Sequence, residues 1–128
     1  MKVEQGQQIE LTVTPDPYVT VRYAGASGDF NPIHIDDRFA QQVGLPGRIL
    51  HGLWTMAQVA RAHTESFGGP ETLKRLSVQF RGMGALEQEI TVSGAVREVH
   101  GNVAIVDSQA TQAGKRIIRN GEAEVSVD

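Results

Sequence analysis

The chain has 128 residues, of which 40% are apolar and 21% are charged, and its formal net charge is −3. This size and balance are typical of a single globular domain, which we expect to span residues 1–128. The chain has no block of basic residues, which argues against binding to nucleic acid or to a membrane surface. It has no cysteine, which excludes disulfides, thiolate metal sites and a cysteine nucleophile.

The N-terminal sequence MKVEQGQQIE is too polar for a signal peptide, and no apolar run approaches membrane-spanning length. We therefore expect a cytoplasmic protein with no membrane segment. Residues 2–14 can form one strand. Asp16-Pro17 is typical of a helix start and predicts a short helix over 18–26, which ends at a glycine.

Two further helices are predicted before residue 70. The first covers 36–44, because acidic residues begin it and a glycine ends it. The second covers 51–66. Its apolar residues occupy much of the helix circumference, which predicts a buried helix rather than a surface one.

Beyond residue 70 the apolar residues recur at every second position, which is the period of a strand. The predicted strands lie at 76–80, 90–96, 103–105, around 117 and at 123–127. Hairpin turns are predicted at 100–102 and 113–115. The sequence therefore predicts an α+β fold, in which an antiparallel meander curls around one long helix and the two short helices lie outside. Because strand edges and a helix flank stay exposed, we expect two sheets to join edge to edge in a homodimer or an equivalent heterodimer.

Polar residues are concentrated in the segment SGDFNPIHID, residues 27–36. One interpretation is an ordinary turn, because Asn and Asp near proline hydrogen-bond their own backbone. In the other, the proline stiffens the bend and extends Asn31, so that the Asp29 carboxylate and the His34 imidazole face one small volume. Such a pair can share a water, remove a proton from it and deliver another nearby. Asn31 is suited to pin this loop through its amide.

The same segment and the nearby His51 offer oxygen and nitrogen ligands for a metal ion. Their spacing does not match a calcium loop, because Ala40 stands where the closing glutamate is needed and no glycine occupies the sixth position. The segment also lacks the HExxH arrangement of helical zinc sites. We therefore predict no metal.

A second motif, GLPGRILHGL at 44–53, leads directly into the long helix. The N–H groups at a helix start are exposed and carry the positive end of the helix dipole. Gly52 has no side chain to obstruct a ligand, so its N–H can bind a carbonyl oxygen that becomes negative during a reaction. A tight turn before the helix is the structural alternative, and the first motif favours the oxyanion site.

The stretch YAGASGDFNPIHID at 23–36, followed by LHGLWTMA at 50–57, resembles the MaoC-like (R)-specific enoyl-CoA hydratases and the related 3-hydroxyacyl-thioester dehydratases. The resemblance spans nearly the whole chain. It implies a hot-dog fold, in which an antiparallel sheet wraps a long central helix. It also implies a 2-enoyl thioester of coenzyme A or acyl carrier protein as the substrate. The sequence RGMGALEQEI at 81–90 lacks the Pro-Val and Gly-Asp pairs that are common in the family between the second and third strands. The resemblance therefore does not extend to the loop expected at the rim of the substrate site.

The resemblance implies reversible hydration of the enoyl thioester to the (R)-3-hydroxyacyl thioester. Asp29 and His34 would be the catalytic pair, with the choice of base and acid left open. Asn31 would support them, and the Gly52 N–H would bind the thioester oxygen. Trp54, bulkier than the aliphatic residue expected there, would either border the acyl chain or fill the core. No cofactor is expected, because the thioester itself makes C3 electrophilic.

Two other functions remain open at this point. Thioester hydrolysis on the same fold would attack the carbonyl carbon, which fits the acid/base motif poorly. A non-catalytic subunit would bind the acyl chain while another hot-dog subunit of a heteromeric dehydratase supplies the chemistry. The presence of both Asp29 and His34 argues against it, because a silent partner has no use for the pair.

Overall fold

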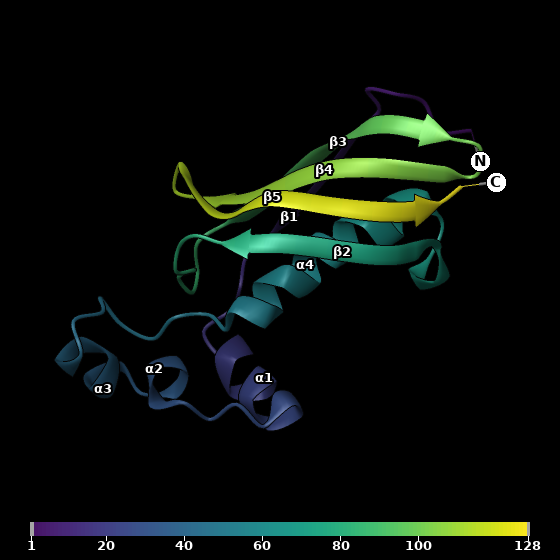
Figure 1. Cartoon of the computed structure of the whole chain (residues 1–128). Coiled ribbons are helices and arrows are strands. Elements are labelled where there is room, and N and C mark those ends of the chain that lie inside the picture. The colour runs from purple at the N-terminus through teal and green to yellow at the C-terminus, as the bar shows by residue number, and fades with distance from the viewer. Residues whose placement is uncertain (1, 128) are drawn as a thin grey trace.

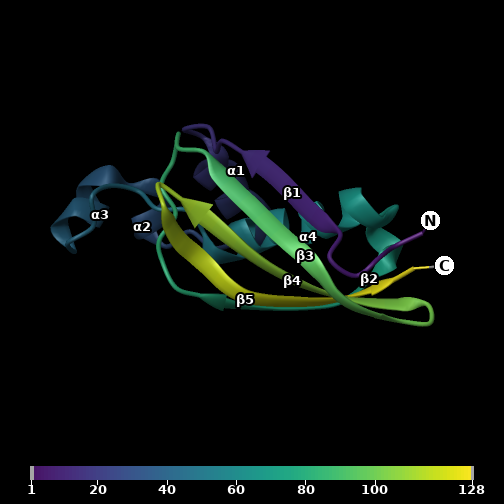
Figure 2. The ribbon, with the colours of Figure 1, turned by 90° about the horizontal axis from the view of Figure 1, so that it is seen from above.

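The computed structural model describes residues 2–127 as one antiparallel sheet that curves around a long helix (Figures 1 and 2). The strands are β1 Gln8–Val13, β2 Leu73–Phe80, β3 Ile90–His100, β4 Val103–Gln112 and β5 Lys115–Ser126. The helices are α1 Val19–Ser27, α2 Pro32–Ile35, α3 Asp37–Gln42 and α4 Gly52–Phe67, with a 3₁₀ turn at Pro70–Thr72. The predicted α+β architecture is confirmed, and α1 to α3 gather beyond the first turn of α4, outside the sheet (Figure 1).

The strand order is β1-β3-β4-β5-β2. The hairpin turns that join β3 to β4 and β4 to β5 lie where the sequence predicts them. The prediction of one continuous meander is wrong for β2, which pairs with β5 instead of β3. The free side of β3 is taken by β1, from Gln8 opposite Ala95 to Val13 opposite Ile90, so β2 cannot pair with β3 and pairs with β5.

Three small residues lie side by side on the central strands of the sheet. Ser108 on β4 lies between Gly94 on β3 and Gly121 on β5 in the strand register. A Cβ at Gly94 would collide with the Asp107 carbonyl oxygen, and a Cβ at Gly121 would collide with the Ser108 hydroxyl. These two glycines permit the close backbone approach that a curled sheet needs.

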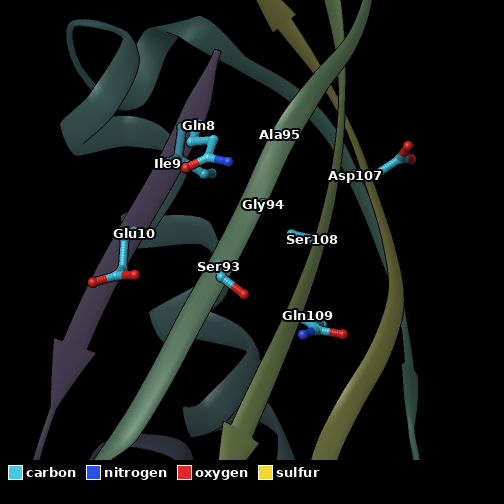
Figure 3. A pocket seen from close by; sticks show the side chains of 9 residues that line it. All are labelled: Gln8, Ile9, Glu10, Ser93, Gly94, Ala95, Asp107, Ser108 and Gln109. Carbon is cyan, nitrogen blue, oxygen red and sulfur yellow. The ribbon is translucent and has the colours of Figure 1, made fainter. Parts of the chain in front are cut away.

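Near these small residues, the face of the sheet that points away from α4 is polar. In Figure 3 the side chains of Glu10, Ser93 and Gln109 extend from β1, β3 and β4, with the ribbon of α4 behind the sheet. They form one cross-strand row, because Glu10 is opposite Ser93 and Ser93 is opposite Gln109. The shallow hollow here has a volume of about 460 Å³. None of the residues of the two sequence motifs lines it.

The core lies between the sheet and α4, to which α4 contributes Val59, Ala62 and Phe67. The other flank of α4 is open, since Leu53 is 62% exposed and Ala57 is also exposed. The predicted burial of this helix holds on the side that the sheet covers, and the expected exposed flank is the one that carries Leu53 and Ala57. Over residues 2–127, no helix has both the length and the apolar character needed to cross a bilayer.

A histidine is enclosed in this core. His63 on α4 is 0% exposed, and its Nδ1 lies 2.7 Å from the Val59 carbonyl oxygen, to which it donates. Burial lowers the pKa of His63 from its usual 6.5, against a smaller opposite effect of the bond to Val59. The folded protein therefore holds a neutral ring, whereas the unfolded chain takes up a proton as the pH falls below that value.

We expect this proton uptake to make the protein less stable below pH 6.5. In that range the free energy of unfolding should fall by up to about 1.4 kcal/mol per pH unit through His63 alone. His63→Leu should flatten this dependence, which urea unfolding at a series of pH values measures. His100→Leu is the matched control, because the His100 side chain is 70% exposed. An equal pH dependence in wild type and His63→Leu would contradict the expectation.

Candidate active site

The first motif runs from the end of α1 through α2. Gly28 ends α1 in the left-handed conformation, with φ 81°. Asn31 then caps α2, because its side-chain oxygen accepts from the Ile33 N–H at 3.2 Å, and Pro32 occupies the first helical position. His34 therefore lies on a one-turn helix that the sequence pattern does not predict. Four residues are too few to show a helical period.

Asp29 and His34 face one another across a short gap. His34 is 8% exposed, and its Nδ1 lies 2.8 Å from the Ile49 carbonyl oxygen. Since a carbonyl only accepts, Nδ1 donates, and the neutral ring carries its lone pair on Nε2. This Nε2 lies 3.9 Å from Oδ2 of Asp29, and the other carboxylate oxygen, Oδ1, accepts from the Asn31 N–H at 3.2 Å. Both atoms are acceptors and cannot hydrogen-bond to each other, but at this separation one water can donate to both.

His51 completes the cluster and is absent from the residues predicted for the site. Its Nε2 lies 3.0 Å from the backbone carbonyl oxygen of Asp29. Its ring stacks on that of His34, with centroids 3.9 Å apart and planes at 19°, and Tyr23 lies 4.7 Å away on a tilted plane. The LHG sequence contains His51, but only the folded structure shows that it reaches the first motif.

Asp29, His34 and His51 bring potential metal ligands within 4.8 Å of one another. The two rings are nearly parallel, so the lone pairs in their planes run side by side and do not converge on one ion. One nitrogen of each ring also faces a backbone carbonyl oxygen. This arrangement does not match the tetrahedral geometry of zinc sites, and the absence of a metal stays a prediction.

Gly52 is the first residue of α4 and directly follows His51, which caps this helix. Among the hydrogen bonds of residues 2–127, its N–H has no protein acceptor. A cavity of about 180 Å³ is lined by His34, Gly52 and Phe80, and another of about 310 Å³ by Asp29, Gly52 and Phe80. Gly52 thus lies where the two cavities adjoin, one lined by His34 and the other by Asp29. Phe80, at the end of β2, is a second lining residue that the sequence does not predict, since only tertiary packing brings it to Gly52.

Trp54 lies elsewhere. It lines a groove of about 460 Å³ between α1 and α4, with Tyr23 and Arg61, and packs partly against the core. It lines neither of the cavities at Gly52. Positions 52 and 54 point about 200° apart around a helix, so the two residues face different sides. Whether Trp54 borders the acyl chain or fills the core stays open, and its place beside the acyl chain stays a prediction.

A family model described as MaoC like domain matches residues 1–120. The chain belongs to the MaoC-like family. It is 32% identical over 121 residues to the fatty acid synthase beta subunit TOXC of Cochliobolus carbonum, a match that covers 91% of this chain and 6% of that protein. The chain therefore spans only a small part of the length of the curated relatives it matches.

Two solved structures extend the comparison. The chain is 27% identical to the R-hydratase PhaJ1 from Pseudomonas aeruginosa in its unliganded form. The two structures superpose with a TM-score of 0.89 over 98% of this chain and 82% of that one. The (R)-hydratase from A. caviae involved in PHA biosynthesis gives a TM-score of 0.91 at 22% identity, over 100% and 99% of the two chains. The second likeness shows the fold alone. The predicted hot-dog fold is confirmed, within a MaoC-like dehydratase family that has (R)-hydratases as structural neighbours.

Proposed function

We propose that this chain reversibly hydrates a 2-enoyl thioester to the (R)-3-hydroxyacyl thioester. The observation that carries the proposal is the pair of acceptors, Asp29 Oδ2 and His34 Nε2, 3.9 Å apart beside a free helix N-terminus. A water that donates one proton to each acceptor points its oxygen lone pairs away from both, toward a substrate. The names of the relatives, a fatty acid synthase subunit and an (R)-hydratase, support an acyl thioester as that substrate.

In the proposed reaction the water oxygen attacks C3 while Asp29 or His34 removes one of its protons. The electron pair of the C2=C3 bond moves toward the thioester carbonyl, whose oxygen becomes negative. The Gly52 N–H and the N-terminal dipole of α4 stabilise that oxygen. C2 then takes a proton from the protonated member of the pair, so that H and OH have been added and both residues return to their starting states.

Purified protein should hydrate crotonyl-CoA and a longer enoyl-CoA, which is followed as loss of the conjugated-thioester absorbance, with chiral analysis of the product. Release of free thiol instead of hydration would identify a thioesterase. Activity that begins only when a second hot-dog subunit is added, and that survives Asp29→Asn in this chain, would identify a non-catalytic partner. Either result would overturn the proposal.

We also propose that the active form is a dimer with a second copy or another hot-dog subunit. Leu53, Phe80 and Met83 are 62%, 48% and 56% exposed, and they adjoin the two cavities at Gly52. Phe80 ends β2, which is an edge strand of the sheet (Figure 1). A partner that pairs with β2 would cover this apolar surface and enclose the acyl chain.

Sedimentation at assay concentration should therefore show a dimer. Leu53→Glu should shift it toward the monomer and lower activity, because it places a charge in the apolar contact. Val43→Glu, at a residue that is 55% exposed after α3, is the matched control and should leave the dimer intact. A fully active monomer would contradict the proposal.

A further inference from the structure

His51 contacts both members of the proposed catalytic pair, although the proposed reaction gives it no step. Because the Asp29 carbonyl oxygen only accepts, the 3.0 Å contact requires the proton on Nε2 of His51, which donates it. The ring also covers one face of His34. His51 is 2% exposed, so water has little access to compete for this bond.

The place of His51 in the chain links the two motifs. It caps α4 directly before Gly52, and its carbonyl oxygen accepts from the N–H groups of Trp54 and Thr55 at 3.1 and 3.3 Å. Its backbone is therefore fixed to the helix that supplies the oxyanion N–H. Its side chain reaches across to Asp29, in the loop between α1 and α2.

The other hydrogen bonds of Asp29 are local. Its N–H donates to Ser27 Oγ at 3.1 Å, and its Oδ1 accepts from the Asn31 N–H at 3.2 Å. These bonds set the shape of the turn but not its position relative to α4. Within the part of the chain that the structure describes, the bond from His51 is the side-chain hydrogen bond that ties Asp29 to the start of α4.

We propose that His51 is a positioning residue, which holds the Asp29 carboxylate at the right place relative to the Gly52 N–H. This inference rests on the proposed hydratase function. It assigns a role to the histidine of the LHG sequence that is separate from proton transfer. His51 acts through Asp29, because the proton on its Nε2 is held by the Asp29 carbonyl oxygen.

Glutamine and asparagine at position 51 separate this role from general packing. Both carry an amide, but Gln places its nitrogen where His Nε2 lies and Asn places it where Nδ1 lies. His51→Asn should lower kcat for crotonyl-CoA by about 10²-fold, the scale of a displacement of about 1 Å in a catalytic geometry, and leave KM nearly unchanged. His51→Gln keeps a donor at the Asp29 carbonyl and should stay close to the wild-type kcat.

Two controls make the test specific. In an Asp29→Asn background, His51→Asn should cause almost no further loss, because no carboxylate remains to be positioned. Thr20→Ala alters a fully buried residue of α1 without touching the His51 bond. It should leave kcat of the folded protein unchanged.

Wild-type kcat in a folded His51→Asn variant, or equal losses in the Asn and Gln variants, would overturn the positioning role. If the wild-type protein does not hydrate crotonyl-CoA, the proposed function fails, and the amide resonance of Asn31 decides the inference by itself. This N–H donates to Asp29 Oδ1, so its NMR chemical shift reports where the carboxylate lies. It should move farther in His51→Asn than in His51→Gln, because both variants lose the His51 ring and only Asn also loses the bond to Asp29, and equal shifts in the two variants would overturn the proposal.

Discussion

Asp29→Asn and His34→Asn are each expected to lower the rate of crotonyl-CoA hydration by about 10²–10⁴-fold, the usual contribution of a general acid or base. Asn at position 29 keeps an oxygen that can accept from the Asn31 N–H at the place of Oδ1, so the turn should survive. Asn at position 34 keeps a donor at the place of Nδ1 for the Ile49 carbonyl oxygen. Each change thus removes one acceptor for the reacting water and preserves the local fold.

The double variant tests whether the two side chains act on one water. If they do, the loss in the double variant should be far smaller than the product of the two single losses. KM should change little, because neither side chain needs to grip the pantetheine arm. Rates of the folded single and double variants, with circular dichroism as the check of folding, decide the matter. Turnover like that of wild type in either folded single variant would contradict the mechanism.

The features that the sequence predicts well are those set by neighbours along the chain. Asp29 and His34 are separated by five positions across an Asn-Pro sequence, so local turn and capping chemistry alone brings them to one volume. The long helix and the hairpins follow from the period of the apolar residues. The start of α4 at Gly52 follows from the glycine-rich motif before it.

The features that the sequence misses depend on contacts between distant segments. The edge that β2 occupies is decided by β1, which takes the free side of β3. His51 reaches Asp29 over 22 positions, and Phe80 approaches Gly52 from the end of a strand. Trp54 illustrates the converse, because nearness in sequence to Gly52 does not place it on the same side of the helix. A pattern of residue types carries no distance information of this kind.

Gly52→Pro is expected to lower turnover by about 10²-fold or more, the scale for loss of one oxyanion donor. The backbone here already has the conformation that a proline requires. Position 52 is the first of α4, where proline is favoured, and His51 before it is extended with ψ 133°, as the residue before a proline requires. The helix should therefore form in the variant.

Gly52→Ala is the matched control, because it adds bulk and keeps the N–H. A Cβ at this position would lie 3.2 Å from Cε1 of Phe80, so both variants press on the same ring, which is 48% exposed and has room to shift. The ratio of kcat/KM between the Ala and Pro variants isolates the hydrogen bond from the crowding. Equal losses would assign the effect to Phe80, and near-normal turnover in a folded Gly52→Pro protein would exclude the N–H as the oxyanion donor. A large loss in Gly52→Pro alone means that the developing charge on the thioester oxygen is stabilised at the first residue of α4.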